Sequence, residues 1–268
     1  RNPGHNRVYY LESEKLALAE LTLTTKRFDQ PCDHIESIDI AGINYLSFTV
    51  GQLLSENELI WLSNLSFIFA LYQQSGDSAE SMLHPVALTP HSYVDPKISM
   101  LLKYGGKTNE IFTRLMINVG LVTSDYGLDD SIQMLDPVAG KGTTLFEGAV
   151  RGFDVTGIEM ERKMVHETTV FFKRFLEQDK YKHTLSKHDM YSSSTGNEAF
   201  IQLFEYARDK QDFKRSEDIS SARRLQNIPP FERPIGVLAA SIITARSINN
   251  SLYRIIVLKN KKFHYFLT

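Results

Sequence analysis

The stretch that decides the fold reads Leu135-Asp136-Pro137-Val138-Ala139-Gly140-Lys141-Gly142-Thr143-Thr144. It joins an apolar segment, Ile132–Leu135, to a predicted helix from Thr143 to about Arg151. Glycine lets a backbone pass close to a ligand without a Cβ clash, and the start of the helix offers unpaired N–H groups. The sequence therefore predicts a ligand-binding turn between a buried strand and a helix.

Two familiar glycine-rich motifs do not fit this turn. A phosphate loop needs a glycine at the position of Leu135, and it needs Ser or Thr where Gly142 follows Lys141. The dinucleotide fingerprint needs a third glycine at position 145, which is Leu145. Phosphate-loop and nicotinamide chemistry are therefore disfavoured.

The segments after the turn extend the same pattern. A second strand, Val155–Ile158, ends at Glu159, and a helix is predicted over Arg162–Gln178. Strand, helix, strand, helix predicts a parallel sheet with crossover helices. A carboxylate at the end of the second strand can accept hydrogen bonds from both ribose hydroxyls of an adenosine ligand. At the C-terminus, Tyr253–Leu258 and Phe263–Leu267 are typical of an antiparallel hairpin.

Charge divides the chain into two parts. Residues 1–90 hold 5 Lys and Arg against 11 Asp and Glu, whereas residues 91–268 hold 25 against 21. Opposite balances within a chain of net charge −2 predict two domains with different surfaces. We place the boundary near residues 75–95, which are rich in Ser, Gly and Pro, and so expect domains at 1–85 and 86–268.

The first domain has mixed helix and strand patterns. Val8–Leu11 and Ile43–Val50 are predicted strands, and Glu14–Leu23 has leucines and alanines at helical spacing. We therefore expect a smaller α+β domain at the N-terminus.

Composition narrows the class of protein further. The chain is 42% hydrophobic and 23% charged, which is typical of a folded globular protein. A single cysteine excludes a disulfide framework and a Cys-based zinc cluster, and the histidines lack metal-ligand spacing, so we expect no metal. No apolar run approaches the ~20 residues of a membrane span. We expect a cytoplasmic protein with no membrane partner, whose gene starts upstream of Arg1.

Asp136-Pro137-x-x-Gly140-x-Gly142-Thr143-Thr144, followed by Glu147-Gly148-Ala149 and Gly157-Ile158-Glu159, resembles the S-adenosylmethionine-binding motifs of amino-group methyltransferases that act on nucleic acids. Most similar is the subgroup that joins an N-terminal RNA-binding domain to a Rossmann-like domain and methylates guanine N2 in tRNA. The resemblance implies an α/β fold whose methyltransferase domain has a mainly parallel sheet with a C-terminal antiparallel hairpin.

The resemblance assigns roles to residues of this chain. Asp136 and the turn would face the methionine part of the cofactor, Glu159 would hold the ribose, and Met160 and Asp189 would contact the adenine. An upstream element would cover the cofactor carboxylate. The implied cofactor-binding residues are Asp136, Pro137, Ala139, Gly140, Gly142, Thr143, Thr144, Glu159, Met160, Asp189, Phe112 and Thr113.

The catalytic motif departs from the family. These enzymes carry Asp, Asn or Ser followed by Pro-Pro and an aromatic residue, or Asp-Leu-Pro-Tyr, after an apolar fourth strand. Here the one Pro-Pro lies in Asn227-Ile228-Pro229-Pro230-Phe231, after the charged, serine-rich segment 216–226. Asn227 and Phe231 are therefore candidate catalytic residues, with a simple connector as the alternative. Either the domain has lost its motif or the sequence omits residues present in the molecule.

The resemblance predicts methyl transfer to an exocyclic base amine of RNA, foremost guanine N2 of tRNA, from S-adenosylmethionine. Such a base must leave its stack to reach the cofactor. Two alternatives are a DNA adenine or cytosine amino-methyltransferase and a non-catalytic S-adenosylmethionine-binding subunit. RNA is the expected partner, with a small activator protein as a second candidate. A basic stretch fits either a phosphate backbone or a solvated helix face; it comprises Lys173, Arg174, Lys180, Lys182 and Lys187.

Overall fold

The computed structural model describes residues 7–75, 82–127, 130, 132–191, 198–208, 223–227, 254–259 and 262–267. The chain forms two compact units. The first comprises residues 1–91 and 111–130, and the second comprises residues 92–110 and 131–268. Residues 111–130, which the sequence assigns to the second domain, thus belong to the first unit.

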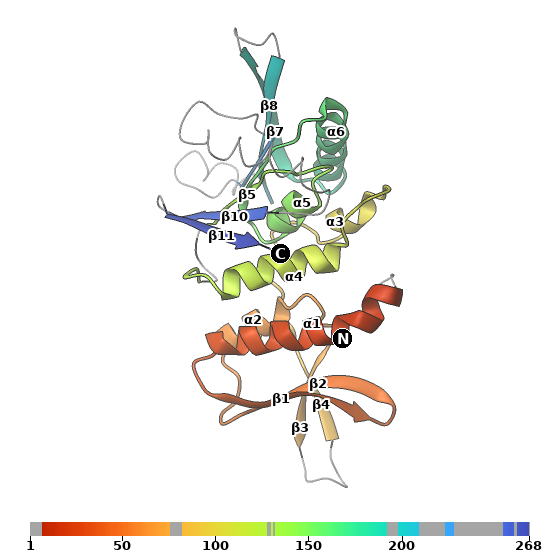
Figure 1. Cartoon of the computed structure of the whole chain (residues 1–268), viewed down its shortest axis with the longest axis vertical. Helices are drawn as coiled ribbons and strands as arrows, with labels where there is room; N and C mark the ends of the chain where they lie inside the picture. The colour runs from red at the N-terminus through yellow and green to blue at the C-terminus, as the bar shows by residue number, and fades with distance from the viewer. Residues whose placement is uncertain are drawn as a thin grey trace. The chain divides into compact units, whose positions relative to one another are not determined.

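Helices and short antiparallel sheets make up the first unit (Figure 1). Strands β1 and β2 pair with each other, as do β3 and β4. The elements in chain order are α1 (Arg7–Thr24), η1 (Thr25–Arg27), β1 (Cys32–Ile40), β2 (Ile43–Val50), α2 (Glu56–Ser63), β3 (Leu71–Ser75), β4 (Met82–Val86) and most of α4 (Glu110–Val122).

One local prediction for this unit is wrong. Val8–Leu11 is not a strand but part of α1, because its aromatic and apolar residues continue into a run of helix-favouring Glu, Lys, Ala and Leu. Pro85, within the stretch where we expect the domain boundary, lies in β4, where a two-stranded sheet leaves an edge that tolerates proline. The strand predicted at Ile43–Val50 is confirmed with those bounds.

A buried carboxylate organises the core of the first unit. Glu20 is 2% exposed and accepts hydrogen bonds from the backbone N–H and hydroxyl of Ser66 and from the side-chain amide of Asn118, at 2.6–3.2 Å. Arg27 donates to the carbonyls of Leu121 and Val122, at 3.0 and 2.9 Å, at the end of α4. Polar contacts thus connect α1 and η1 to α4 across about 95 residues of sequence.

The second unit is a mixed α/β structure. Its described strands form one sheet in the order β11-β10-β5-β6-β9-β8-β7. Their bounds are β5 (Gln133–Asp136), β6 (Asp154–Gly157), β7 (Lys182–Tyr191), β8 (Glu198–Ala207), β9 (Arg223–Asn227), β10 (Arg254–Lys259) and β11 (Lys262–Leu267).

Parallel pairing in this sheet is confined to its centre. β6 runs parallel to β5 on one side and to β9 on the other, whereas the other pairings of the described strands are antiparallel. The expected mainly parallel sheet is therefore wrong, because β7 and β8 form a hairpin without the crossover that parallel neighbours require. The predicted antiparallel hairpin at the C-terminus is confirmed as β10 and β11.

Three helices complete the second unit: α3 (Ile98–Leu101), α5 (Thr143–Val150) and α6 (Arg162–Gln178). Helix α5 approaches the sheet closely at Gly148, where a Cβ would collide with Met134 of β5 and Val155 of β6. On α6, Phe172 is fully buried and its ring lies 5.0 Å from Phe204 and 5.4 Å from Tyr206 of β8. Aromatic packing therefore fixes the β7–β8 hairpin against α6.

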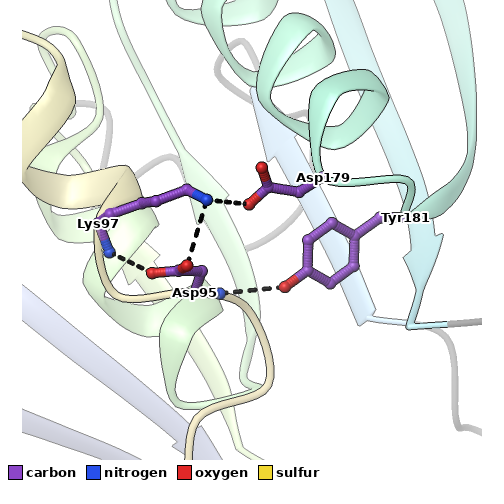
Figure 2. A network of polar contacts seen from close by, with 4 residues as sticks. All are labelled: Asp95, Lys97, Asp179 and Tyr181. Carbon is purple, nitrogen blue, oxygen red and sulfur yellow. Dashed lines mark hydrogen bonds and ion pairs between the residues drawn. The ribbon is translucent and has the colours of Figure 1, made fainter.

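A polar network joins residues 95–97 to the end of α6 and the start of β7 (Figure 2). The Lys97 ammonium lies 2.7 Å from a carboxylate oxygen of Asp179 and 3.2 Å from one of Asp95. The Tyr181 hydroxyl accepts a hydrogen bond from the backbone N–H of Asp95 at 3.1 Å. The bonds to Asp179 and then Asp95 raise the pKa of Lys97. This network attaches residues 95–97, near the start of the second unit, to the end of α6 and to Tyr181.

The turn packs closely on β6 at Gly157. A Cβ at this position would lie 2.8 Å from the Cβ of Ala139 and 2.6 Å from a methyl carbon of Leu145. We expect Gly157→Ala to lower the free energy of unfolding by about 1–3 kcal/mol, because overpacking a dense core forces its neighbours apart.

Gly105→Ala is the matched control, since nothing lies within 4 Å of a Cβ there. Its effect should stay within about 0.5 kcal/mol. Urea unfolding followed by circular dichroism measures both variants. Equal stabilities would contradict the close packing of the turn on β6.

Candidate functional site

The turn between β5 and α5 depends on two glycines in left-handed conformations. Gly140 has φ +54° and Gly142, which caps α5, has φ +84°. The backbone N–H of Gly142 donates to the carbonyl of Ala139 at 2.8 Å, which closes the turn. Residues with a Cβ adopt such angles at a cost, so the glycine spacing seen in the sequence is a backbone requirement.

Hydrogen bonds fasten this turn to the end of β6. The backbone N–H of Ala139 donates to the carbonyl of Ile158 at 2.9 Å, and that of Ile158 donates to the carbonyl of Asp136 at 2.8 Å. Gly140 donates its N–H to Oε2 of Glu159 at 2.9 Å. The predicted ligand turn and the predicted strand-end carboxylate are therefore brought together.

Glu159 keeps acceptor capacity after these contacts. Its Oε1 accepts the backbone N–H of Glu161 at 2.8 Å, so each carboxylate oxygen has one such bond. A carboxylate offers about four lone-pair sites, and Glu159 is half-buried. A ligand hydroxyl can therefore still bind here. The next residue, Met160, is 64% exposed and provides an apolar surface beside the carboxylate.

Asp136 is a buried acid at the end of β5. It is 2% exposed and accepts the backbone N–H of Val138 at 3.0 Å and a hydrogen bond from Thr144. Burial raises the pKa of Asp136 to about 6, against the lowering effect of these two bonds, and the charge of Glu159 adds to the rise. A buried carboxylate of this kind is suited to a cationic ligand group, which would repay its desolvation.

Lys141 and Tyr104 form contacts around the turn that the sequence did not predict. The Lys141 ammonium lies 2.6 Å from a carboxylate oxygen of Glu167 on α6 and 4.9 Å from the centre of the Tyr104 ring. The ion pair lowers the pKa of Glu167. The Tyr104 hydroxyl and the Thr143 hydroxyl form a hydrogen bond at 3.1 Å. No local pattern around Tyr104 could reveal these contacts, since they arise from folding.

Thr168 adds an unsatisfied group beneath the turn. It is 2% exposed, its Oγ1 has no hydrogen-bond partner in the described part of the chain, and its Cγ2 lies 3.1 Å from where a Cβ of Gly142 would be. Gly142 thus meets α6 at close range, which is a second reason for glycine at this position.

The candidate catalytic residue Asn227 and the candidate adenine contact Asp189 lie on different strands of the sheet. Asn227 ends β9 and pairs in parallel register with Gly157, so its backbone lies at the same sheet edge as the turn. Asp189 lies on β7, at the far edge of the sheet, with β8 and β9 between it and β6. The resemblance assigns Asp189 to the adenine, but the strand beside β6 is β9 and not β7.

The remaining predicted site residues belong to several parts of the chain. Phe112 and Thr113 belong to α4 in the first unit, where Phe112 packs beside the buried cluster of Ala17, Phe67 and Leu115, and Thr113 is fully buried. Phe231 lies outside the described residues. Pro137 lies in the turn after β5. The structure therefore brings together the predicted site residues between positions 136 and 160.

Comparisons with protein-family models, curated proteins and solved structures found no match for this chain. Within the described ranges, no group of three or more His, Cys, Asp or Glu residues is placed to hold a metal ion. No helix among the same residues has the length and apolar character to cross a membrane.

The raised pKa of Asp136 predicts a pH dependence of stability. The carboxyl group of Asp136 binds its proton more tightly in the folded state than in the unfolded chain. The contribution of the protonated group to stability is therefore complete below about pH 4. It is lost as the pH rises through about 6, and by pH 7 the loss reaches on the order of 3 kcal/mol.

Asp136→Asn removes this titration while keeping an acceptor for Val138. Its unfolding free energy should therefore fall less than that of the native chain between pH 4 and 7, as urea titrations at each pH can measure. Parallel pH profiles for the two proteins would show that Asp136 is not the acid responsible.

Proposed function

We propose that the second unit is a Rossmann-like domain that binds S-adenosylmethionine, and that the protein transfers its methyl group to an exocyclic amine of an RNA base, foremost guanine N2 of tRNA. The observation that carries this proposal is the bond from the Gly140 N–H to Glu159, which joins a glycine turn to a carboxylate at the end of a parallel strand. Adenosine ligands bind across such an arrangement in doubly wound sheets.

Strand register supports the position proposed for the cofactor. Asp136, Gly157 and Asn227 are successive partners across β5, β6 and β9, so the carboxyl ends of these parallel strands meet at one edge. Ligands of open α/β sheets bind outside that edge. The cofactor, when bound, supplies a methyl group on a sulfonium; this chain would supply the carboxylates, the turn and the exclusion of water around it.

The donor set fits the parts of this cofactor. The carboxylate of Asp136 would attract the ammonium of the methionine part, and its elevated pKa would then fall on binding. Glu159 has acceptor sites for the two ribose hydroxyls, and Met160 offers an apolar contact for the adenine. Affinity should therefore increase as the pH rises through about 6 and Asp136 ionises.

RNA as the substrate rests on the charge balance and on the family resemblance. Residues 91–268 carry more Lys and Arg than Asp and Glu, while the first ninety residues are acidic. The second unit would therefore provide much of the attraction for phosphates, and the first unit would orient the RNA. Methyl transfer needs a target amine held in line with the sulfonium, so positioning of an extruded base would supply much of the rate.

One observation favours a second candidate, a non-catalytic S-adenosylmethionine-binding subunit. In the family the catalytic motif follows an apolar fourth strand, whereas the strand that ends at the candidate Asn227 is β9, with the sequence Arg-Arg-Leu-Gln-Asn. A partner chain would then have to supply the groups that hold the amine.

Transfer of labelled methyl from S-adenosylmethionine to bulk tRNA, with duplex DNA in parallel, tests the proposal. Label recovered as N2-methylguanosine after nucleoside digestion is the expected result. Glu159→Ala should reduce transfer by about 100-fold, since it removes the ribose acceptor and the bond to Gly140 (two interactions to a charged group at ~1.5 kcal/mol each).

Glu161→Ala is the matched control, because Glu161 is an exposed carboxylate two residues away. It should transfer methyl at close to the native rate. Label in DNA alone would replace RNA by DNA as substrate. Cofactor binding without transfer to either nucleic acid would favour the non-catalytic subunit, and absence of cofactor binding would overturn both.

A further inference from the structure

The β7–β8 hairpin and the start of α6 bring two cations to one aromatic ring. The guanidinium carbon of Arg162 lies 5.8 Å from the centre of the Phe200 ring, and the ammonium of Lys187 lies 5.4 Å from it. Arg162 and Lys187 are exposed and Phe200 is half-buried. The ring attracts each cation through its quadrupole and so holds two like charges in one small region.

The cluster has a fixed position because the hairpin is anchored in the core. Phe204 and Tyr206, which are fully buried against Phe172, lie on the same face of β8 as Phe200, since alternate residues of a strand share a face. Lys187 pairs in register with Gln202 and is on this face as well. Helix α6 lies beside the β7–β8 hairpin (Figure 1). Its Phe172 contacts the buried rings of β8, and its Arg162 lies over the ring of Phe200.

The cluster also borders the proposed site. Arg162 is the first residue of α6 and follows Glu159 by three residues, with the exposed Met160 between them. Other exposed cations continue along α6 and into β7, among them Lys163, Arg174, Lys180 and Lys182, whereas Lys173 is paired with Glu177. Positive charge therefore extends away from the adenosine end of the site along one helix.

We propose that Arg162, Lys187 and Phe200 form a phosphate-binding patch that holds the RNA backbone beside the proposed cofactor site. Two exposed cations held at one ring can both donate charge-assisted hydrogen bonds to the same phosphate group. The arginine fork and the lysine ammonium recognise phosphates without reading sequence. The patch would thus fix the register of an RNA whose target base enters the site.

This inference takes RNA as the substrate class from the proposed function, but its test uses binding alone. The experiment measures the affinity of the full chain for bulk tRNA, by fluorescence anisotropy, at several salt concentrations. We expect Arg162→Ala and Lys187→Ala each to weaken binding about fivefold and to lower the slope of log affinity against log salt by about 1. The double variant should lower that slope by about 2.

Two further variants separate the patch from a general effect of charge. Lys173→Ala removes one exposed cation from the same helix, where Lys173 pairs with Glu177 at 3.7 Å, and should leave affinity within twofold of native. Phe200→Leu keeps an apolar side chain but loses the ring, and should weaken binding about threefold with both cations present. Circular dichroism shows whether each variant keeps the native fold.

If the folded Arg162→Ala/Lys187→Ala variant binds tRNA with the affinity and salt slope of the native chain, the proposed patch is wrong. It is also wrong if Lys173→Ala weakens tRNA binding as much as Arg162→Ala or Lys187→Ala does. Failure of the native chain to bind tRNA at low salt would overturn it too. S-adenosylhomocysteine binding, measured on the same samples, tests the cofactor separately. If the native chain binds tRNA but not S-adenosylhomocysteine, and the double variant loses tRNA binding, the patch is supported and the proposed methyl transfer is not.

Discussion

The bond from the Gly140 N–H to the Glu159 carboxylate is the contact on which the proposed site depends. This bond forms because Gly140 and Gly142 adopt left-handed backbone angles and because Gly157 leaves space for Ala139 to approach β6. Backbone bonds from Ala139 and Ile158 complete the junction. Hydrogen bonds therefore join the ends of two adjacent parallel strands, with the buried Asp136 on one and the half-buried Glu159 on the other.

Local sequence was a good guide to this junction. The turn, the helices on either side of β6 and the carboxylate at the end of β6 all follow from local patterns in residues 132–178, and α6 begins and ends at the residues predicted. Glycine spacing is informative because a left-handed angle or a close approach excludes most other residues. The sequence could therefore place half of the candidate site before any fold was known.

Long-range pairing was not predictable in the same way. The sequence indicated only a basic stretch near β7 and nothing at β8. The sheet shows that these segments form an antiparallel hairpin, which places Asp189 on the edge strand. β9, with its two arginines and Gln226, lacks the apolar run of a buried strand, yet it pairs with β6. Pairing of segments separated by tens of residues depends on the whole fold, as do the contacts of Glu20 with Asn118 and of Arg162 with Phe200.

The measurement that tests the central claim most directly is calorimetric titration of the chain with S-adenosylhomocysteine at pH 7.5, with NADH as the comparison ligand. The glycine turn and the paired acids predict saturable one-to-one binding of S-adenosylhomocysteine with a Kd below about 1 mM, equivalent to more than about 4 kcal/mol. NADH should bind far more weakly, because Leu145 replaces the third glycine of the dinucleotide fingerprint. Tighter binding of NADH, or no heat with either ligand, would contradict the account.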